Sequence, residues 1–258
     1  SYINKYFDTL RILGEGDFGE VKEVQSKQTS EKFAIKIFKV DKMKVKSGLN
    51  YTKTNLDEIR AHMSLPPHPN LIQFYQAWKE DGYLYMQMEL SQYSLDGYWR
   101  MKNKLTLKDL EDVTVDCLQA LKHLESHNIA HLDIKPQNIL RSENGVYKLA
   151  DFSVTIDLNK DTSSSEFGTG RFAAPELLNG IFSTKADLYS LGISLSQVCV
   201  PSDAQLKEDE WTSLKEKGLL PTRVLEALSG PFGLAAMVQS MIHEHSSRPS
   251  AEELLPED

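Results

Sequence analysis

The segment "IAHLDIKPQNIL", residues 129–140, places a carboxylate, an ammonium group and an amide at short intervals between apolar stretches: Asp133, Lys135 and Asn138. A second carboxylate, Asp151, ends a β-like run in "YKLADFS". Phosphoryl transfer from ATP needs a carboxylate aimed at the accepting hydroxyl, cations on the phosphates and oxygen ligands for Mg²⁺. The four side chains are candidates for these parts.

A cover over the phosphates is the next requirement, and "GEGDFGEV", residues 14–21, is the candidate. Its G-x-G-x-x-G spacing also occurs in dinucleotide-binding folds, where a helix follows the glycines. Here Val21 and Val24 are flanked by polar residues without a helical stripe, which indicates a strand. The glycines are therefore predicted to form a hairpin tip whose backbone N–H groups can approach a ligand closely. For this motif alone, a glycine hairpin without a ligand is the alternative.

Lys36 lies in the apolar run "FAIK", where a charge needs a function or a route to solvent. The helix predicted over residues 55–65 carries Leu56, Ile59 and Met63 at helical spacing. Glu58 lies on a different face of that helix from Leu56 and Met63, and it could orient Lys36 by an ion pair. A structural lysine on an edge strand and a solvated glutamate are the alternatives.

Apolar patterning divides the chain into a β-rich first third and a mainly helical remainder. Strands are predicted over residues 7–14, 20–26, 32–39, 71–79 and 83–90, with the helix at 55–65 between them. Helical patterns follow near residues 110–124, 184–199, 234–242 and 250–255. The prediction is an α+β protein with a small β-rich lobe, residues 1–90, and a larger, mostly α-helical lobe, residues 91–258.

Composition restricts the partners. The 258 residues are 40% hydrophobic and 26% charged, with a net charge of −8, which argues against broad binding to nucleic acid or to an anionic membrane. Cys117 and Cys199 lie in apolar helical patterns and are predicted to be buried free thiols. Because no signal pattern occurs and the uncharged run 188–202 is too short to span a bilayer, we expect an intracellular protein, cytoplasmic or nuclear. We also expect a monomer. Any membrane association would come from segments outside this chain.

Together with "AAPELL", "KADLYSLGISL" and "SSRPS", these segments resemble the eukaryotic protein kinase family across essentially the whole chain. The resemblance implies a bilobal protein-kinase fold, ATP and Mg²⁺ as cofactors and a protein substrate. It implies that Glu176 and Arg248 form an ion pair and that Asp187 braces the catalytic loop. Its catalytic residues are Asp133, which accepts the hydroxyl proton, Lys135 on the γ-phosphate and Lys36 on the α/β oxygens; its metal ligands are Asn138 and Asp151. Its ATP-binding residues are Leu13, Gly14, Glu15, Gly16, Gly19, Val21, Ala34, Lys36, Glu58, Met88, Glu89 and Ser91.

A finer resemblance is to the Wee/Myt branch, and within it more to the membrane-associated Myt kinases. It is carried by "FYQAWKEDGYLYMQMELSQYSL", by the leucine of "HLDIKPQN", by Glu58-x-x-x-His62 and by "DEWTSLKEKGLLP". It implies an inhibitory kinase acting on Tyr, or on adjacent Thr and Tyr, in the Gly-rich loop of cyclin-dependent kinases. Ser153 in place of a glycine and "FGTGRFAAPE" in place of a Glu-Gly-Asp segment depart from the branch.

Two other functions remain open. A Ser/Thr kinase with other substrates is supported by Lys135 and by Gly168-Thr169, and Thr169 leads us to expect phosphorylation of Thr or Ser at least as efficient as that of Tyr. A pseudokinase scaffold is disfavoured, because none of its usual losses has occurred. The side chains concerned are Lys36, Glu58, Asp133, Asn138 and Asp151.

Overall fold

The computed structural model describes residues 1–16, 19–38, 53–160, 167–168 and 170–256. Its contacts divide the chain into two compact units. The first unit is Ser1–Pro67 with Ile72–Ser91, and the second is His68–Leu71 with Gln92–Asp258.

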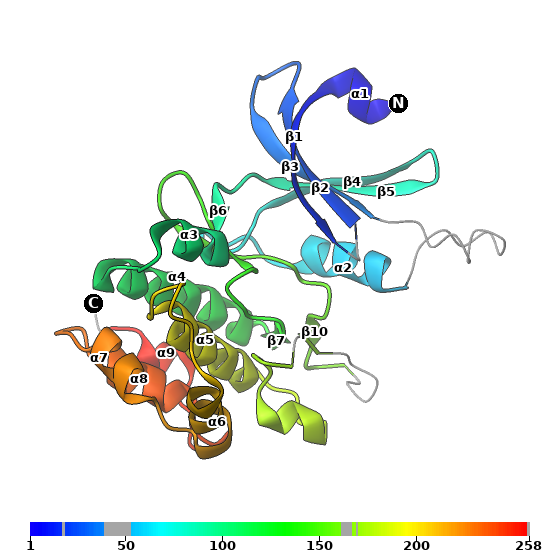
Figure 1. Cartoon of the computed structure of the whole chain (residues 1–258). Helices are drawn as coiled ribbons and strands as arrows, with labels where there is room; N and C mark the ends of the chain where they lie inside the picture. Colours follow the sequence, from blue (N-terminus) through cyan, green and yellow to red (C-terminus); the bar gives the residue numbers. More distant parts are fainter. Residues whose placement is uncertain (17–18, 39–52, 161–166, 169, 257–258) are drawn as a thin grey trace. The chain divides into compact units, whose positions relative to one another are not determined.

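The first unit is built on one antiparallel sheet with the strand order β1-β2-β3-β5-β4 (Figure 1). β2 follows β1 without a helix, as the valine pattern predicted. The predicted strand from Leu71 instead begins at Phe74, because Leu71 pairs with Leu149 in the second unit. The strands are β1 (Phe7–Gly16), β2 (Gly19–Ser26), β3 (Lys32–Phe38), β4 (Phe74–Glu80) and β5 (Tyr83–Glu89).

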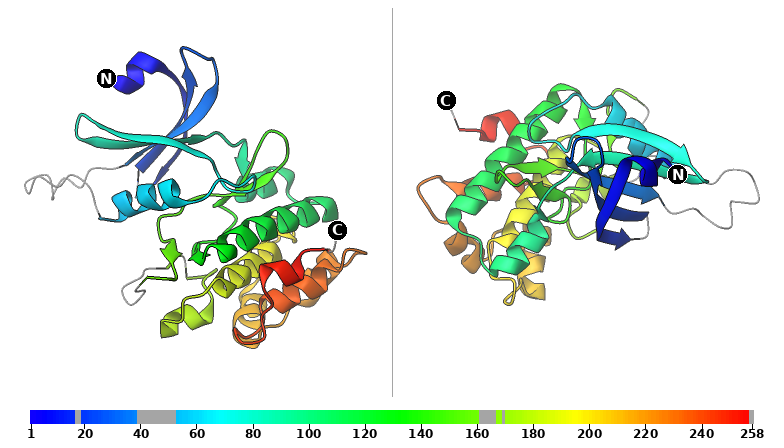
Figure 2. Two further views of the ribbon diagram at one scale, coloured as in Figure 1. Left: turned by 180° about the vertical axis from the view of Figure 1, so that it is seen from behind. Right: turned by 90° about the horizontal axis from the view of Figure 1, so that it is seen from above.

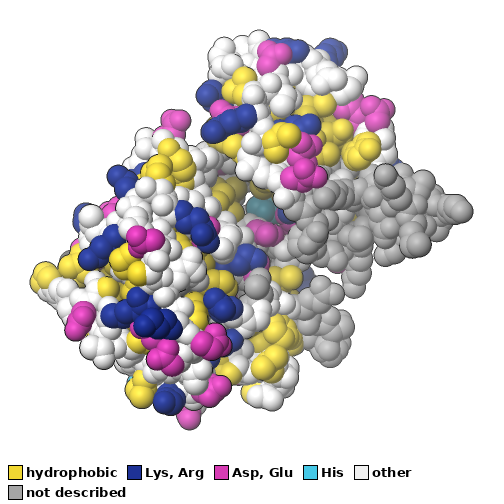
Figure 3. Space-filling view, in the orientation of Figure 1, with side chains coloured by type: hydrophobic (Ala, Val, Ile, Leu, Met, Phe, Trp, Pro, Cys, Tyr) yellow, Lys and Arg dark blue, Asp and Glu magenta, His cyan; other side chains and the backbone are white. Residues whose placement is uncertain are grey.

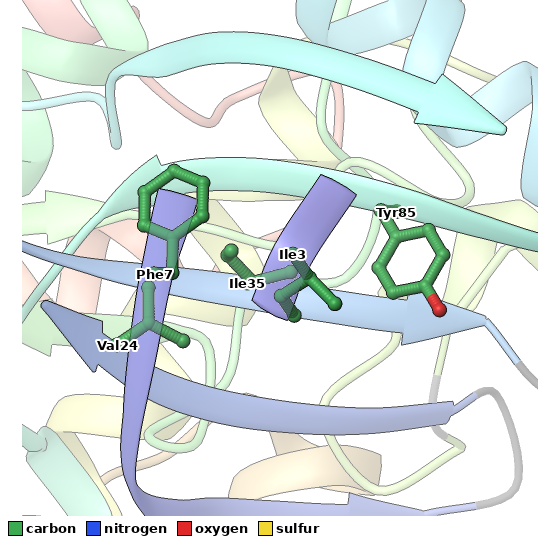
Figure 4. Close-up of a cluster of buried hydrophobic side chains, with 5 residues drawn as sticks. All are labelled: Ile3, Phe7, Val24, Ile35 and Tyr85. Carbon is green, nitrogen blue, oxygen red and sulfur yellow. The ribbon is translucent and has the colours of Figure 1, made fainter. Parts of the chain in front are cut away.

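Two helices cover opposite faces of this sheet. Because side chains alternate along a strand, Ile35 of β3 points to one face and Lys36 and Phe38 point to the other. On the Ile35 face, α1 (Tyr2–Tyr6) adds Ile3 to a buried cluster with Phe7, Val24 and Tyr85 (Figure 4). The sequence patterns did not predict α1, which is too short for a periodic signal.

On the Lys36 face lies α2 (Lys53–Ser64), the helix predicted from residue 55. Ile59 packs there with Phe38, Leu84 and Met86. Met63 has the same helical spacing but is 65% exposed. Leu56, which is partly buried, also packs against this cluster.

The second unit is built around α4 (Leu107–Ser126) and α5 (Lys185–Val198), which lie side by side in Figures 1 and 2. Every residue of α5 from Ala186 to Val198 is buried, which marks it as the central helix. Cys117 and Cys199 are buried free thiols, as predicted. Around these two helices lie α3 (Leu95–Lys102), α6 (Glu208–Lys217), α7 (Thr222–Leu228), α8 (Leu234–Met241), α9 (Ala251–Leu254) and the 3₁₀ helix η2 (Pro175–Asn179).

Short strands frame the candidate catalytic segments. β6 (Tyr93–Ser94), β8 (Ile139–Arg141) and β9 (Tyr147–Leu149) form one sheet, and β7 (Ile129–Ala130) pairs with β10 (Ile156–Asp157). The β-rich first unit and the mainly helical second unit agree with the α+β architecture that the resemblance implied. No helix within the described ranges combines the length and the apolar character needed to cross a membrane.

Candidate active site

The loop between β7 and β8 brings together three of the predicted residues. Lys135 Nζ donates a hydrogen bond to Asp133 Oδ2 at 2.7 Å, and Asn138 Nδ2 donates to the same oxygen at 2.8 Å. Asn138 Nδ2 also donates to the Asp133 backbone oxygen at 2.9 Å. These bonds fix the orientation of a carboxylate that is only 8% exposed. A carboxylate held in one direction can take a proton from a correctly placed hydroxyl.

Asn138 and Asp151 fit a divalent cation. Both hydrogen bonds of the Asn138 side chain within the described residues use its nitrogen, so its amide oxygen can serve as a hard ligand. The Ala150 N–H donates to the Asn138 backbone oxygen at 2.9 Å, which places Asp151 beside this segment. One amide oxygen and one carboxylate are the ligand types that Mg²⁺ prefers.

Asp187, in the first turn of α5, binds the backbone of the catalytic loop, the segment between β7 and β8. Its carboxylate accepts the N–H groups of His131 and Leu132, each at 2.7 Å. Burial raises the pKa of Asp187 to about 7, and the two N–H bonds oppose that shift. Leu132 has a φ of +64°, a left-handed conformation that costs a leucine free energy and that these bonds help to stabilise. The brace implied by the family resemblance is present.

His131 links the two catalytic segments. It is fully buried, and burial lowers its pKa, so it is neutral. With its proton on Nε2 it donates to the Ala150 backbone oxygen at 3.0 Å, and its Nδ1 accepts the Asp133 N–H at 3.3 Å. The His131 side chain therefore packs in the interior and positions Ala150 and Asp133 by hydrogen bonds; it is not placed to act as a base.

Gly168 contacts the candidate base, and sequence reasoning did not predict this. Its N–H donates to the Leu132 backbone oxygen at 2.9 Å. A Cβ added at Gly168 would lie 2.7 Å from Asp133 Cβ and closer still to the carboxylate. Only glycine therefore fits here without movement. Thr169, the basis of the expected acceptor preference, lies outside the described residues.

In the first unit, Lys36 and Glu58 form an ion pair with 2.6 Å between Nζ and Oε1. The side chains are 13% and 3% exposed. β3 lies between β2 and β5, so Lys36 is not on an edge strand, and Glu58 is not solvated. Both alternatives for these residues were therefore wrong.

Strand register places other predicted ATP-binding residues on the same sheet face as Lys36. Val21 pairs with Lys36, and Ala34 pairs with Met88; directly paired residues point to the same side. Glu89, at the end of β5, donates its N–H to the Gln73 backbone oxygen. Leu13, Glu15 and Gly16 lie in β1, and Ser91 follows β5.

Two glycines of the hairpin, Gly14 and Gly19, differ in how much space the protein leaves for a side chain. A Cβ at Gly14 would meet no described protein atom within 4 Å, which leaves room for a ligand. A Cβ at Gly19 would overlap the Ile37 carbonyl oxygen and lie 3.1 Å from its carbon, at a φ of +154°. Gly19 is thus already required by the packing of β2 on β3. The tip, residues 17–18, lies outside the described residues.

The ion pair implied for the second unit is also present. Arg248, which is 1% exposed, donates to Glu176 with 2.5 Å between Nη1 and Oε1. The same nitrogen donates to the Lys185 backbone oxygen at 2.7 Å, so the pair ties η2 to the start of α5. Breaking a buried pair of this kind leaves an uncompensated charge.

The protein kinase domain profile matches residues 7–257, so the chain belongs to the protein kinase family. Proteins of this family use ATP and a divalent metal.

Among curated proteins, the chain is 33% identical over 257 residues to the "Membrane-associated tyrosine- and threonine-specific cdc2-inhibitory kinase wee-1.3" of Caenorhabditis briggsae, covering 98% of this chain and 38% of that protein. It is 35% identical over 258 residues to the "Membrane-associated tyrosine- and threonine-specific cdc2-inhibitory kinase" of Drosophila melanogaster, covering 99% and 47%. The identity to the "Mitosis inhibitor protein kinase wee1" of Schizosaccharomyces pombe is 26% over 288 residues, covering 100% and 32%. These similarities confirm the resemblance to the Wee/Myt branch. The chain spans less than half the length of each of these relatives.

The buried Leu132 leads to a prediction about activation. In many kinases an arginine next to the catalytic aspartate binds a phosphorylated loop residue and orders the loop. Leu132 is apolar and 2% exposed, so it cannot bind a phosphate. We expect phosphatase treatment of the purified kinase to leave kcat/KM unchanged within about twofold. Loss of activity on dephosphorylation, with recovery when residues 162–169 are phosphorylated again, would contradict this.

Proposed function

We propose that this enzyme is an inhibitory kinase of cyclin-dependent kinases that transfers the γ-phosphate of Mg-ATP to Thr and Tyr in their Gly-rich loop. The observation that carries the proposal is the identity of 33–35% with cdc2-inhibitory kinases across 98–99% of the chain. Glu58-x-x-x-His62 and Leu132, which belong to the resemblance with that branch, lie in buried positions beside the ion pair and the candidate base.

On the nucleotide side, the proposal assigns a role to each described contact. Bound ATP supplies the phosphoryl group, and Mg²⁺ neutralises the charge that develops on it. Lys36, oriented by Glu58, binds the α/β oxygens. Asn138 contributes its amide oxygen and Asp151 its carboxylate to Mg²⁺. Val21, Ala34 and Met88 line the apolar sheet face on which the adenine lies.

On the acceptor side, Asp133 would receive the proton of the substrate hydroxyl as its oxygen bonds to the γ-phosphorus of ATP, while the β–γ bridging P–O bond breaks and ADP leaves. The bonds from Lys135 and Asn138 hold its carboxylate in place. Lys135 also stabilises the negative charge on the transferred group. Positioning and electrostatic stabilisation supply most of the catalysis of phosphoryl transfer, so these fixed contacts matter more than any covalent step.

The test is phosphoamino-acid analysis and site mapping of a cyclin–cyclin-dependent kinase complex after incubation with this enzyme and Mg-ATP. We expect phosphothreonine and phosphotyrosine in the substrate's Gly-rich loop, with Thr phosphorylated at least as well as Tyr. The matched control is the same complex with that Thr and Tyr replaced by Ala and Phe, which should take up no phosphate. Phosphate incorporated only elsewhere, or on unrelated proteins in preference, would favour the Ser/Thr kinase with other substrates.

The proposed setting is the inside of the cell, in the cytoplasm or nucleus, with this chain acting as a monomer. The names of several relatives include "membrane-associated". For this protein, we place any such association in segments beyond residues 1–258.

A further inference from the structure

Two cationic side chains, Arg171 and Lys215, lie at or beside residues 170–171, a few residues beyond the contact between Gly168 and Asp133, the candidate base. Lys215 Nζ donates to the Gly170 backbone oxygen at 2.6 Å. The Arg171 guanidinium lies over the ring of Trp211, 4.6 Å from its centroid. Trp211 and Lys215 are four residues apart on α6, so they share one helix face. That face and the turn at residues 170–171 hold both cations together.

The proximity of the two charges is electrostatically unfavourable. Burial lowers the pKa of Lys215, and the positive charge of Arg171 lowers it further. Within the described residues, no carboxylate forms an ion pair with either cation. Arg223 and Arg248, by contrast, form ion pairs with Glu210 and Glu176.

An unneutralised pair of cations is unexpected in this protein. The chain has 37 acidic residues against 29 lysines and arginines. Charged side chains of both signs are mixed over the face shown in Figure 3. α6 itself begins with Glu208, Asp209 and Glu210, of which Glu210 binds Arg223. The chain therefore has carboxylates near Arg171 and Lys215 in sequence, but no carboxylate of the described residues forms an ion pair with either cation. This favours an anionic ligand that is not part of the chain.

The arrangement suits one type of ligand. An arginine stacked on an aromatic ring keeps the N–H donors at its edge, and this planar fork matches a carboxylate or a phosphate. Lys215 donates one hydrogen bond within the described residues, to a backbone carbonyl, which leaves ammonium N–H groups for the same anion. The two cations therefore form a small site that suits a carboxylate or a phosphate.

The site lies close to the reaction. Gly168 contacts Asp133, and Arg171 follows it by three residues, a separation that spans at most about 10 Å of extended chain. A substrate strand that presents its hydroxyl to Asp133 covers the same span with about three residues.

We propose that Arg171 and Lys215 form a subsite that binds an acidic side chain of the protein substrate within about three residues of the accepting hydroxyl. This rests on the part of the proposed function that makes Asp133 the base. It does not require that the substrate be a cyclin-dependent kinase.

The test is a positional peptide library with Thr or Tyr as acceptor, in which Glu and its neutral isostere Gln are compared at each nearby position. The native enzyme should prefer Glu by about five- to tenfold in kcat/KM at one or two of these positions, the range expected for a charge-assisted hydrogen bond near the surface. Arg171→Ala and Lys215→Met should each remove most of the preference, and added salt should reduce it. Lys217→Met, an exposed lysine on the same helix, is the matched control and should leave it intact.

A second measurement does not depend on peptide turnover. A Glu-rich peptide without hydroxyl side chains should inhibit phosphorylation of a protein substrate, and its Gln counterpart should inhibit at least about fivefold less. Arg171→Lys keeps the charge but loses the planar fork, so it should give an intermediate preference if Arg171→Ala fails to fold. Equal use of Glu and Gln peptides together with equal inhibition would overturn the subsite. The two proposals can fail separately. The enzyme can phosphorylate a cyclin-dependent kinase without preferring Glu peptides, and it can prefer Glu peptides without phosphorylating a cyclin-dependent kinase.

Discussion

Replacing Asp133 by Asn should lower kcat by about 10²–10⁴-fold, the contribution usual for a general base, while the KM for ATP changes little. The asparagine oxygen can still accept from Lys135, so the loop keeps its shape, but the side chain can no longer take the hydroxyl proton. Steady-state kinetics at saturating protein substrate, together with nucleotide binding by titration, would measure both quantities.

Two further variants separate the role of Asp133 from a general effect of removing charge. Asp151→Asn should weaken Mg-ATP binding as well as turnover, because it removes a metal ligand and not the base. Asp112→Asn removes an exposed carboxylate that pairs with Lys108 on α4, and it should leave both parameters unchanged. If Asp133→Asn and Asp151→Asn affected binding and turnover equally, the separate roles of base and ligand would be wrong.

The parts of the fold that the sequence predicted are those with strong periodic patterns. The strands of the first unit alternate apolar residues, and α4 carries Leu110, Cys117, Leu118, Leu121 and Leu124 on one buried face. α1 and α3 were missed because five and eight residues give too short a window for a helical period. Met63 has the spacing of Leu56 and Ile59 yet is exposed, because spacing predicts a shared helix face but not how far the neighbouring sheet extends along the helix.

The sequence predicted the site residues that belong to short motifs in a characteristic order. It did not predict contacts between residues that only the tertiary structure brings together. Spacing alone could suggest that Glu58 orients Lys36, but only the burial of Glu58 removes the solvated alternative. Gly19 shows the converse: its motif suggests a ligand, whereas its backbone angle and the Ile37 carbonyl already require a glycine. The contact of Gly168 with Asp133 spans thirty-five residues of sequence, and no local pattern encodes it.

Gly168→Ala should lower kcat by about 10²-fold through this contact, with a smaller effect on the KM for ATP. The added carbon would lie 2.7 Å from Asp133 Cβ, whereas carbon atoms in contact prefer about 3.5–4.0 Å, so one group must move by about 1 Å. The N–H bond from Gly168 to Leu132 restrains the glycine, and Asp187 restrains Leu132 in turn. The carboxylate of Asp133 is then displaced from the hydroxyl that it must deprotonate.

Gly170→Ala is the matched control, because a Cβ there would meet nothing within 4 Å among the described atoms. It makes the same chemical change two residues away and should alter kcat by less than about twofold. Gly168→Ser would enlarge the overlap and should be at least as inactive as Gly168→Ala. Thermal unfolding of each variant separates lost positioning from lost folding: a variant with a native midpoint and low kcat has a displaced base. Were Gly168→Ala and Gly170→Ala to turn over equally fast, the segment at residues 167–168 would have to move away from Asp133 during catalysis, and the close contact would not position the base.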